Sequence, residues 1–417
     1  MRTYYPWLIA LIAGLTLLVS NGMSITGLPV YDEFLLTEFG WGRGELKFRD
    51  MITFLVVGCL APFAGILIDR WGVRVCMLMG WSLLIAAYVA YSALESLSGL
   101  YMIHTVLGLV LLLCGLNVAV ILVSHWFVEK RGTAIGIALV GTSLGGAVLP
   151  QYGTHMIQSV GWRDALQSEV VFPILMIALT IFLVRNKPQD MGMEPVGGAL
   201  IKSTTGSQSG MGYAEALRTR TFWALTIIAM ATYYTVLGVQ AHVFLYMRDL
   251  AFTPGAATNA ISVFFICALI GKIVFGILAD YLKPKKVFYG NILVMAVGAC
   301  LLASMQKQFI WVAVTLFGLG WGGVYTMIQL SAMNSFGLKS AGKILGTITV
   351  LDALGGGLGI WLTGVMYSVY GDYRIAFTVF AVLILVAFFC ISQVKGVDLK
   401  KDDLIAPQTG KIGGGLT

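Results

Sequence analysis

Long apolar runs recur from one end of this chain to the other, and they constrain its fold more than any other feature. Most of them contain about 18 or more mainly apolar residues, enough for a helix to cross a hydrocarbon core about 30 Å thick. Only 11% of the 417 residues are charged, whereas about a quarter of a soluble chain is charged. The runs do not alternate as the strands of an outer-membrane barrel do. The sequence therefore predicts an all-α integral membrane protein.

Twelve of these runs are predicted to be transmembrane helices, arranged as two groups of six. They cover residues 6–31, 47–69, 74–94, 98–127, 132–158, 166–185, 221–247, 257–280, 286–305, 308–335, 342–368 and 375–394. A polar stretch rich in Gly, Ser, Thr and Pro separates the groups, and this composition is typical of a linker. The predicted organisation is an N-terminal six-helix bundle (1–185), a linker (186–218), a C-terminal six-helix bundle (219–394) and a tail (395–417).

The distribution of charges predicts the orientation in the membrane. With both termini and the linker in the cytoplasm, 19 of the 27 Lys and Arg residues lie on that side and seven on the other, whereas the acidic residues divide nine to ten. An excess of Lys and Arg marks the cytoplasmic side of a membrane protein. We therefore predict a multi-pass protein of the cell membrane with cytoplasmic termini. The net charge of +7 then reflects topology and does not indicate nucleic-acid binding.

An internal repeat relates the two groups of helices. The segment "GILIDRWGVRV" (65–75) returns 211 residues later as "GILADYLKPKK" (276–286). Such a repeat indicates two halves that rock about a site near the bilayer midplane. The first copy resembles the loop 2–3 signature of the major facilitator superfamily, which implies a conformational-gate motif. Its residues are Gly65, Asp69, Arg70, Gly72 and Arg74, with Gly276 and Asp280 as the weaker second copy.

A narrower resemblance is to the monocarboxylate porter and oxalate/formate antiporter branches of that superfamily. It rests mainly on "WFVEKRGTAIGIALVGTSLGG" (126–146) and on "RNKPQDMG" before the linker. On the eighth span the Asp-x-x-x-Arg pair of monocarboxylate porters aligns with Ala268 and Lys272, so the acid is absent here. The resemblance implies a monomeric secondary transporter, without a cofactor, that moves a small organic monocarboxylate with a proton by alternating access. Two alternatives stay open: organic anion exchange without proton coupling, and a transport-like nutrient receptor.

The resemblance also implies that spans 1, 4, 7 and 10 line a central cavity, so their polar residues are candidates for substrate binding. They are Asn21 and Tyr31 on the first span, Asn117 on the fourth, Tyr233 and Tyr234 on the seventh, and Tyr325 and Gln329 on the tenth. Taken singly, each could instead be a hydrogen bond between helices or a packed aromatic. As a set they describe a moderately polar, aromatic-lined pocket for a small organic molecule.

Two charges remain within the spans, Lys272 and Asp352. By helix rise, Lys272 lies about 12 Å from Asp280 and Asp352 about 13.5 Å from Lys343, both of which are at cytoplasmic helix ends. The two charges are therefore predicted near the midplane, where charged residues are paired or functional. In one interpretation they form a salt bridge between helices. In the other, Lys272 binds the substrate carboxylate, and Asp352 is its resting partner or carries the coupled proton.

Other motifs are not interpreted as chemistry. Gly141–Gly145 matches G-x-S-x-G and Gly318–Gly323 matches G-x-G-x-x-G, but both lie within apolar helical runs, without the strands that those motifs require. The glycines of the first motif are predicted to form a close-packing helix face. The histidines have no metal-ligand spacing, so neither an enzyme nor a metal site is predicted. Charged residues before and within the start of the second span are predicted at the outer rim, as gate or surface charges. They are Arg43, Lys47, Arg49 and Asp50.

Overall fold

The computed structural model describes residues 4–197, 210–337 and 340–394. Part of the predicted linker and the whole predicted tail lie outside these residues. The N-terminal half contains α1 (Tyr5–Asn21), α2 (Asp32–Phe39), α3 (Arg43–Ser92), α4 (Leu97–Cys114), α5 (Leu116–Trp126), α6 (Arg131–Val160), α7 (Trp162–Glu169) and α8 (Val171–Leu183). The C-terminal half contains α10 (Arg220–Asp249), α11 (Pro254–Tyr281), α12 (Pro284–Ala303), α13 (Ile310–Phe336), α14 (Ala341–Tyr370) and α15 (Arg374–Cys390), preceded by the short α9 (Tyr213–Ala216).

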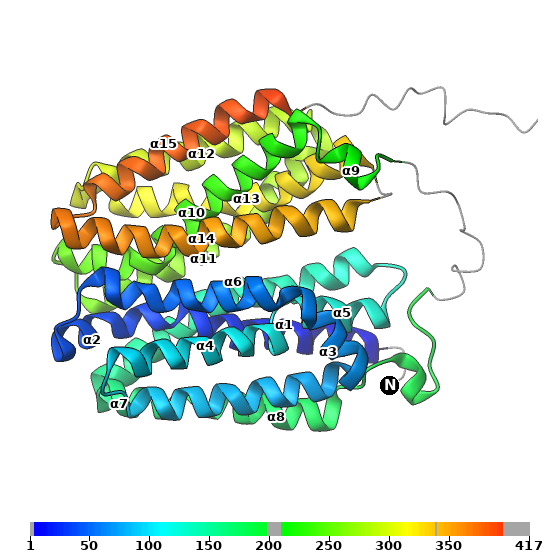
Figure 1. Cartoon of the computed structure of the whole chain (residues 1–417), viewed down its shortest axis with the longest axis horizontal. Helices are drawn as coiled ribbons and strands as arrows, with labels where there is room; N and C mark the ends of the chain where they lie inside the picture. The colour runs from blue at the N-terminus through cyan, green and yellow to red at the C-terminus, as the bar shows by residue number, and fades with distance from the viewer. Residues whose placement is uncertain (1–3, 198–209, 338–339, 395–417) are drawn as a thin grey trace, which may run out of the picture.

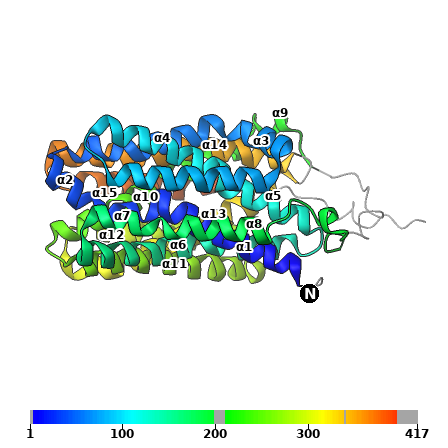
Figure 2. The same ribbon diagram turned by 90° about the horizontal axis from the view of Figure 1, so that it is seen from below.

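The two halves lie against each other as two bundles whose helices run roughly parallel, as Figure 1 shows. Two helix pairs form most of the boundary between them. Helix α3 packs on α14, and α6 packs on α11. Figure 2 shows these two pairs on opposite sides of the molecule, so that α1, α10 and α13 lie between them.

Eleven helical stretches among the described residues are long and apolar enough to cross a membrane. The first part of α3, residues 43–71, supplies the twelfth crossing and carries several of the charges described below. The backbone of α3 is non-helical at Gly72, whose φ is 79°. A side chain there would strain the backbone and would also meet the Asn186 side chain at 2.6 Å, so glycine suits this turn. The prediction of an all-α membrane protein with twelve helices in two halves is confirmed.

The end of the first span differs from the prediction. The sequence predicts that it ends at residue 31, but helical structure continues to Phe39 through a π-helical turn (Gly22–Thr26), a 3-10 turn (Leu28–Tyr31) and α2. The acidic start of α2 reads as polar in the sequence, yet Asp32 is fully buried because it pairs with Lys47 and Arg49 of α3. Gly40, with φ of 69°, then ends the span.

The predicted glycine faces pack helices tightly against each other. A Cβ at Gly141 would collide with the carbonyl oxygen of Gly14, and one at Gly145 would come within 2.5 Å of that of Leu18, so these glycines let α6 approach α1. In the C-terminal half a Cβ at Gly322 would lie 2.8 Å from the backbone nitrogen of Lys272. Glycine at these positions therefore lets α6 contact α1 and α13 contact α11. The packing interpretation of the Gly141–Gly145 motif is confirmed.

Candidate functional site

Charged side chains join the two halves at the end opposite the termini. Arg43 donates hydrogen bonds from Nη1 and Nη2 to the two carboxylate oxygens of Asp249, at 2.7 Å each. In the same way Arg248 donates to the two carboxylate oxygens of Glu33, at 2.8 Å each. Bidentate pairs of this kind fix geometry as well as contributing energy. Because each pair links one half to the other, we refer to these two pairs as the outer clasp.

A buried charge cluster lies behind the outer clasp. Asp32 pairs with Lys47 at 2.5 Å and with Arg49, and all three side chains are fully buried. Asp50 lies 3.8 Å from Lys47, and Lys47 also donates to the carbonyl oxygen of Ala241 on α10, in the other half, at 2.6 Å. The prediction that Lys47, Arg49 and Asp50 lie at the rim is therefore wrong. The reason is that α2 brings Asp32 into the protein as a counter-charge.

The outer clasp leads to a testable prediction. Replacing Glu33 and Asp249 together, as Glu33→Gln and Asp249→Asn, removes one partner from each pair. Each pair contributes up to about 1 kcal/mol, so losing both should raise the ratio of molecules open at this end by up to roughly 30-fold. Spin labels at Thr37 and Gln308, exposed positions at this end of the two halves, should then report a longer distance population.

A matched control for the clasp variant exists at the same end. Glu38 pairs with Arg163 at 2.6 Å, but both residues belong to the N-terminal half. The variant Glu38→Gln should leave the distance distribution unchanged. Equal effects of the control and the clasp variant would show that the clasp pairs do not hold the halves together.

Uncharged hydrogen bonds between α6 and α11 also join the two halves, deeper in the protein than the outer clasp. Thr154 and Thr258 share a hydrogen bond of 2.6 Å, and Ser262 donates to the carbonyl oxygen of Ala147 at 2.6 Å. Gln151 donates to Asn259 and Ser262 at 2.9 Å each. Further inward than these uncharged contacts, Lys272 Nζ donates to Ser143 Oγ at 3.2 Å.

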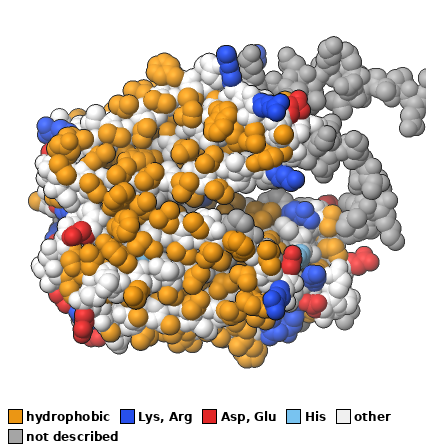
Figure 3. All heavy atoms as spheres, in the orientation of Figure 1, with side chains coloured by type: hydrophobic (Ala, Val, Ile, Leu, Met, Phe, Trp, Pro, Cys, Tyr) orange, Lys and Arg blue, Asp and Glu red, His pale blue; other side chains and the backbone are white. Residues whose placement is uncertain are grey.

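Beyond Lys272, towards the termini, the described residues form no hydrogen bond or ion pair between the halves. Figure 3 shows the surface hollowed between the two halves towards this end. The structure is therefore closed at one end, open at the other, and Lys272 lies at the depth where the closure stops.

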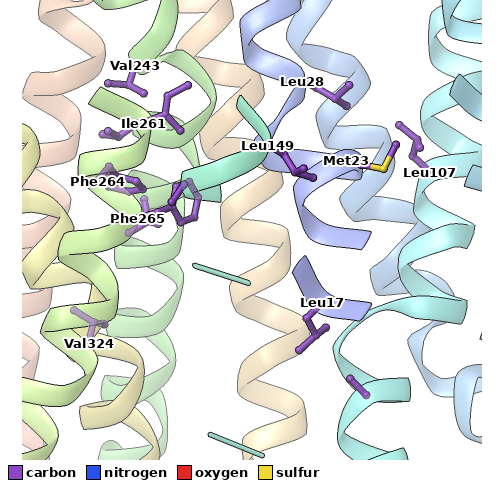
Figure 4. Packing of buried hydrophobic residues seen from close by; sticks show 14 of the residues in the cluster. Leu17, Met23, Leu28, Leu107, Leu149, Val243, Ile261, Phe264, Phe265 and Val324 are labelled. Carbon is purple, nitrogen blue, oxygen red and sulfur yellow. The ribbon is translucent and has the colours of Figure 1, made fainter. Parts of the chain in front are cut away.

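Lys272 is held on α11 beside aromatic rings. Its ammonium lies 6.0 Å from the ring centroid of Trp321, at the limit of a cation–π contact. Trp321 is stacked on Phe264 at 5.0 Å and meets Phe265 edge-on at 5.4 Å. Figure 4 shows Phe264 and Phe265 on α11, with Leu149 of α6 across the boundary. This packing holds the Trp321 ring in place beside the ammonium, and Lys272 as a residue is half-buried.

Asp352 lies in a separate small pocket of the C-terminal half. The pocket is lined by Tyr233, Trp321, Tyr325 and Asp352 among others, and its volume of about 10 Å³ holds about one water molecule. Asp352 is 6% exposed. No ion pair within 4.0 Å joins it to Lys272 in the part of the chain that the structure describes. The salt bridge between these two residues is not formed in this conformation, although Trp321 contacts both sites.

The remaining candidate substrate-binding residues are scattered. Tyr31 is fully buried and donates to Glu169 at 2.6 Å, within the N-terminal half. Tyr234 packs edge-on against Phe380 at 5.8 Å, away from the pocket that Tyr233 lines. Three other candidates lie where water or lipid can reach them: Asn21 is half-buried at the end of α1, whereas Asn117 on α5 and Gln329 on α13 are exposed.

Among the described residues, no ion pair joins the predicted gate motif to the other half. Asp69, Arg70 and Asp280 are exposed, and the described residues give Asp69 no ion-pair partner. Arg74 instead fastens the α3 turn to the end of α8: its backbone nitrogen donates to Asn186 Oδ1 at 2.8 Å and its guanidinium to the carbonyl oxygen of Ile181 at 2.6 Å. A Cβ added at Gly276 would lie 3.9 Å from the side chain of Thr326. Gly65 lies within α3.

Two residues of this site, and the buried Glu169 outside it, were not singled out by the sequence. Ser143 was included only in a packing motif, yet it is the hydrogen-bond partner of Lys272. Trp321 lies within a glycine-rich run, and nothing in that run indicated a role for the tryptophan. Glu169 looks like an ordinary residue near a helix start, and only its burial distinguishes it. A polar residue on the small-residue face of α6 was the one available signal for Ser143.

The two helical halves lie in the membrane, contact each other at one end and are separated at the other. Polar groups lie at the depth where the contacts between the halves end. This arrangement defines the class of secondary transporters. The chain belongs to the Major Facilitator Superfamily, whose model matches residues 12–360 and 241–405. It is therefore a multi-pass membrane protein of a transporter family, not an enzyme.

Several characterised proteins are similar to this chain. The oxalate:formate antiporter of Oxalobacter formigenes is 25% identical over 72% of this chain and 71% of its own length. Monocarboxylate transporter 13 of Bos taurus is 25% identical over 80% and 78%, and monocarboxylate transporter 1 of Mus musculus is 20% identical over 84% and 76%. The confirmed family includes both branches that the sequence suggested.

A solved structure shows the same fold. A bacterial homologue of the human lysosomal transporter Spinster superposes with a TM-score of 0.73, covering 94% of this chain and 97% of its own, at 17% identity. At that identity the likeness concerns the fold alone.

Proposed function

We propose that this protein is a secondary transporter that moves a small organic monocarboxylate across the membrane by alternating access, in symport with a proton. The observation that carries the proposal is the position of Lys272. Its ammonium is at the inner limit of the closure, and its hydrogen-bond partner, Ser143, is uncharged. No carboxylate lies within 4.0 Å of it among the described residues. A cation in a membrane interior requires a counter-charge, and a substrate carboxylate would supply one.

The size and charge of the site favour a small acid with one carboxylate. The pocket beside Asp352 holds only about one water molecule, so the organic part of the acid would lie in the open cleft, against Trp321 and Tyr325. One ammonium with a carboxylate nearby gives little net charge for a dianion. The names of the relatives, an oxalate:formate antiporter and monocarboxylate transporters, support an organic acid as the substrate class.

The proposed orientation places both termini in the cytoplasm, and the protein acts as a monomer. Two observations support the orientation. The excess of Lys and Arg lies on the side of the termini, and the Spinster homologue with the same fold was solved in an inward-facing state. The open end of this structure would then face the cytoplasm.

A thermal-shift screen tests the substrate class. Purified protein is heated with short-chain, hydroxy-, keto- and aromatic acids, and with the amide of each acid as a control. A ligand at 100 times its dissociation constant stabilises the folded state by about 2.7 kcal/mol, so at least one acid should raise the unfolding temperature by several degrees. The amides should not do so. Equal shifts from acids and amides would overturn recognition of a carboxylate.

An acid identified in this screen can be used to distinguish symport from anion exchange and from a receptor. An acid that binds is reconstituted in liposomes, where symport predicts uptake that rises with an inward proton gradient. Exchange that needs a counter-substrate and ignores pH would select the anion exchanger. Saturable binding with negligible uptake would select the receptor.

A further inference from the structure

Glu169 is a buried carboxyl at the junction of α7 and α8. It is the last residue of α7, about 10 Å along the helix from Trp162 by helix rise, and its side chain belongs to a residue that is 2% exposed. It lies in the N-terminal half, distant in sequence from both Lys272 and Asp352. Neither the transport proposal nor the family motif uses it.

Hydroxyl groups and small residues surround this carboxyl. Tyr31 donates its hydroxyl to Glu169 Oε1 at 2.6 Å. The Tyr88 hydroxyl lies beside the carboxyl and gives its own proton to the carbonyl oxygen of Met23 at 2.6 Å. A hydroxyl that donates one hydrogen bond can still accept another, so Tyr88 can accept a hydrogen bond from a protonated Glu169. On α6, a Cβ at Gly153 would lie 3.1 Å from Glu169 Oε1, so glycine leaves room for the carboxyl.

Basic side chains on the neighbouring helices form ion pairs with carboxylates other than Glu169. On α7 itself, Arg163 pairs with Glu38 and donates to the carbonyl oxygen of Ser92. On α3, Lys47 and Arg49 pair with Asp32.

The other titratable groups on the neighbouring elements are two tyrosines, one carboxylate and one histidine. Tyr91 of α3 accepts from Arg49, and Tyr152 of α6 donates to Ser168. Asp164 and His155 are exposed on α7 and α6. Within the described residues, no cation lies within 4.0 Å of Glu169.

We propose that Glu169 is a proton-binding site and that its carboxyl is protonated in this conformation. An ionised carboxylate without a counter-charge is costly in a low-dielectric interior, and such a group takes up a proton instead. A protonated carboxyl fits the hydroxyl cage, because it accepts from Tyr31 and donates to Tyr88. The ligand is a proton, and the site is separate from the one proposed for the transported acid.

The proton site is tied to the closed end through the first span. Tyr31 lies in the 3-10 turn and Met23 in the π-helical turn, and Asp32 and Glu33 follow directly. Glu33 forms one of the two pairs of the outer clasp, with Arg248. A ligand that binds one conformation more tightly shifts the population towards it. The proton on Glu169 therefore favours the closed outer end, and raising the pH favours a conformation in which Glu169 reaches water.

Infrared spectroscopy of purified protein, with no substrate present, tests protonation directly. At neutral pH the wild type should show the carbonyl stretch of a protonated carboxylic acid that is absent from Glu169→Gln. The band should persist in Asp352→Asn, which removes the buried acid of the other half. Tyr31→Phe removes a hydrogen bond to the carbonyl and should move the band to higher frequency. If Glu169→Gln fails to fold, this shift alone still identifies the group.

A second measurement tests the consequence for the closed end. With spin labels at Thr37 and Gln308, the open fraction of the wild type should rise with pH, and that rise should be lost in Glu169→Gln. Asp352→Asn should retain it. The proposal would be overturned by a spectrum that shows Glu169 only as a carboxylate. It would also be overturned if the open fraction of Glu169→Gln still rose with pH. Neither readout requires that an organic acid be transported.

Discussion

Replacing Lys272 by glutamine is expected to abolish uptake of the transported acid while the protein still folds and inserts. Hydrogen bonds to a charged group contribute about 1.5–3 kcal/mol each. Loss of the ammonium should therefore weaken acid binding on the order of 100-fold. Folding should survive because Gln retains a donor for Ser143 and because Gly322, not the ammonium, sets the contact between α11 and α13. Uptake into liposomes and the thermal shift with the acid measure the two effects.

Two further variants separate the charge of Lys272 from its geometry. Lys272→Arg keeps the charge but replaces a compact ammonium with a planar fork, so partial uptake is expected. Ser143→Ala removes only the resting partner and should change acid affinity by less than about tenfold, because the substrate would replace that hydrogen bond. Normal acid binding by Lys272→Gln would return Lys272 to a structural role.

The architecture was predictable from the sequence because its causes are local. Span length follows from the thickness of the hydrocarbon core, and the number of spans follows from counting apolar runs. The interpretation of Gly141 and Gly145 as packing positions succeeded for the same reason, since a missing Cβ has the same effect wherever two helices cross. Only the first part of α3 would have been missed by an apolarity criterion alone, because four charged residues lie within its first two turns.

The arrangement of charges was less predictable because it depends on partners distant in sequence. Lys47 and Arg49 look like rim residues until α2 brings Asp32 beside them. Similarly, equal depth suggested that Lys272 and Asp352 meet, yet depth along two helices does not specify the direction in which each side chain points. Lys272 reaches across to Ser143 in the other half. That bond belongs to one conformation, so no pattern within a single helix could reveal it.

The scatter of the aromatic candidates has a related cause. Tyr233 and Tyr234 are adjacent on α10, so about 100° of rotation separates their side chains. One lines the Asp352 pocket and the other packs against Phe380. The sequence could place both residues on a cavity-lining span but could not set the rotation of that helix. The structure therefore narrows the tyrosines that neighbour Asp352 to Tyr233 and Tyr325.

Asp352→Asn is expected to separate binding from energetic coupling. Asparagine imitates the shape of the protonated carboxyl but cannot release a proton. The variant should still bind the acid, and should exchange labelled for unlabelled acid within about threefold of the wild-type rate. It should fail to accumulate the acid against a gradient when only a pH difference drives uptake. The measurements are counterflow and pH-driven uptake in the same liposomes.

The reasoning behind this prediction starts from the position of Asp352 beside Tyr233 and Tyr325, without an ion-pair partner among the described residues. When an acid occupies Lys272, its negative charge adds to that of an ionised Asp352 across Trp321. Proton uptake by Asp352 removes this repulsion, so acid and proton should bind together. By reciprocity, acid affinity should improve as pH falls in the wild type and should not do so in Asp352→Asn. Glu169→Gln, with Asp352 intact, should keep this pH dependence of affinity. Accumulation by Asp352→Asn at the wild-type level would show that another group carries the coupled proton.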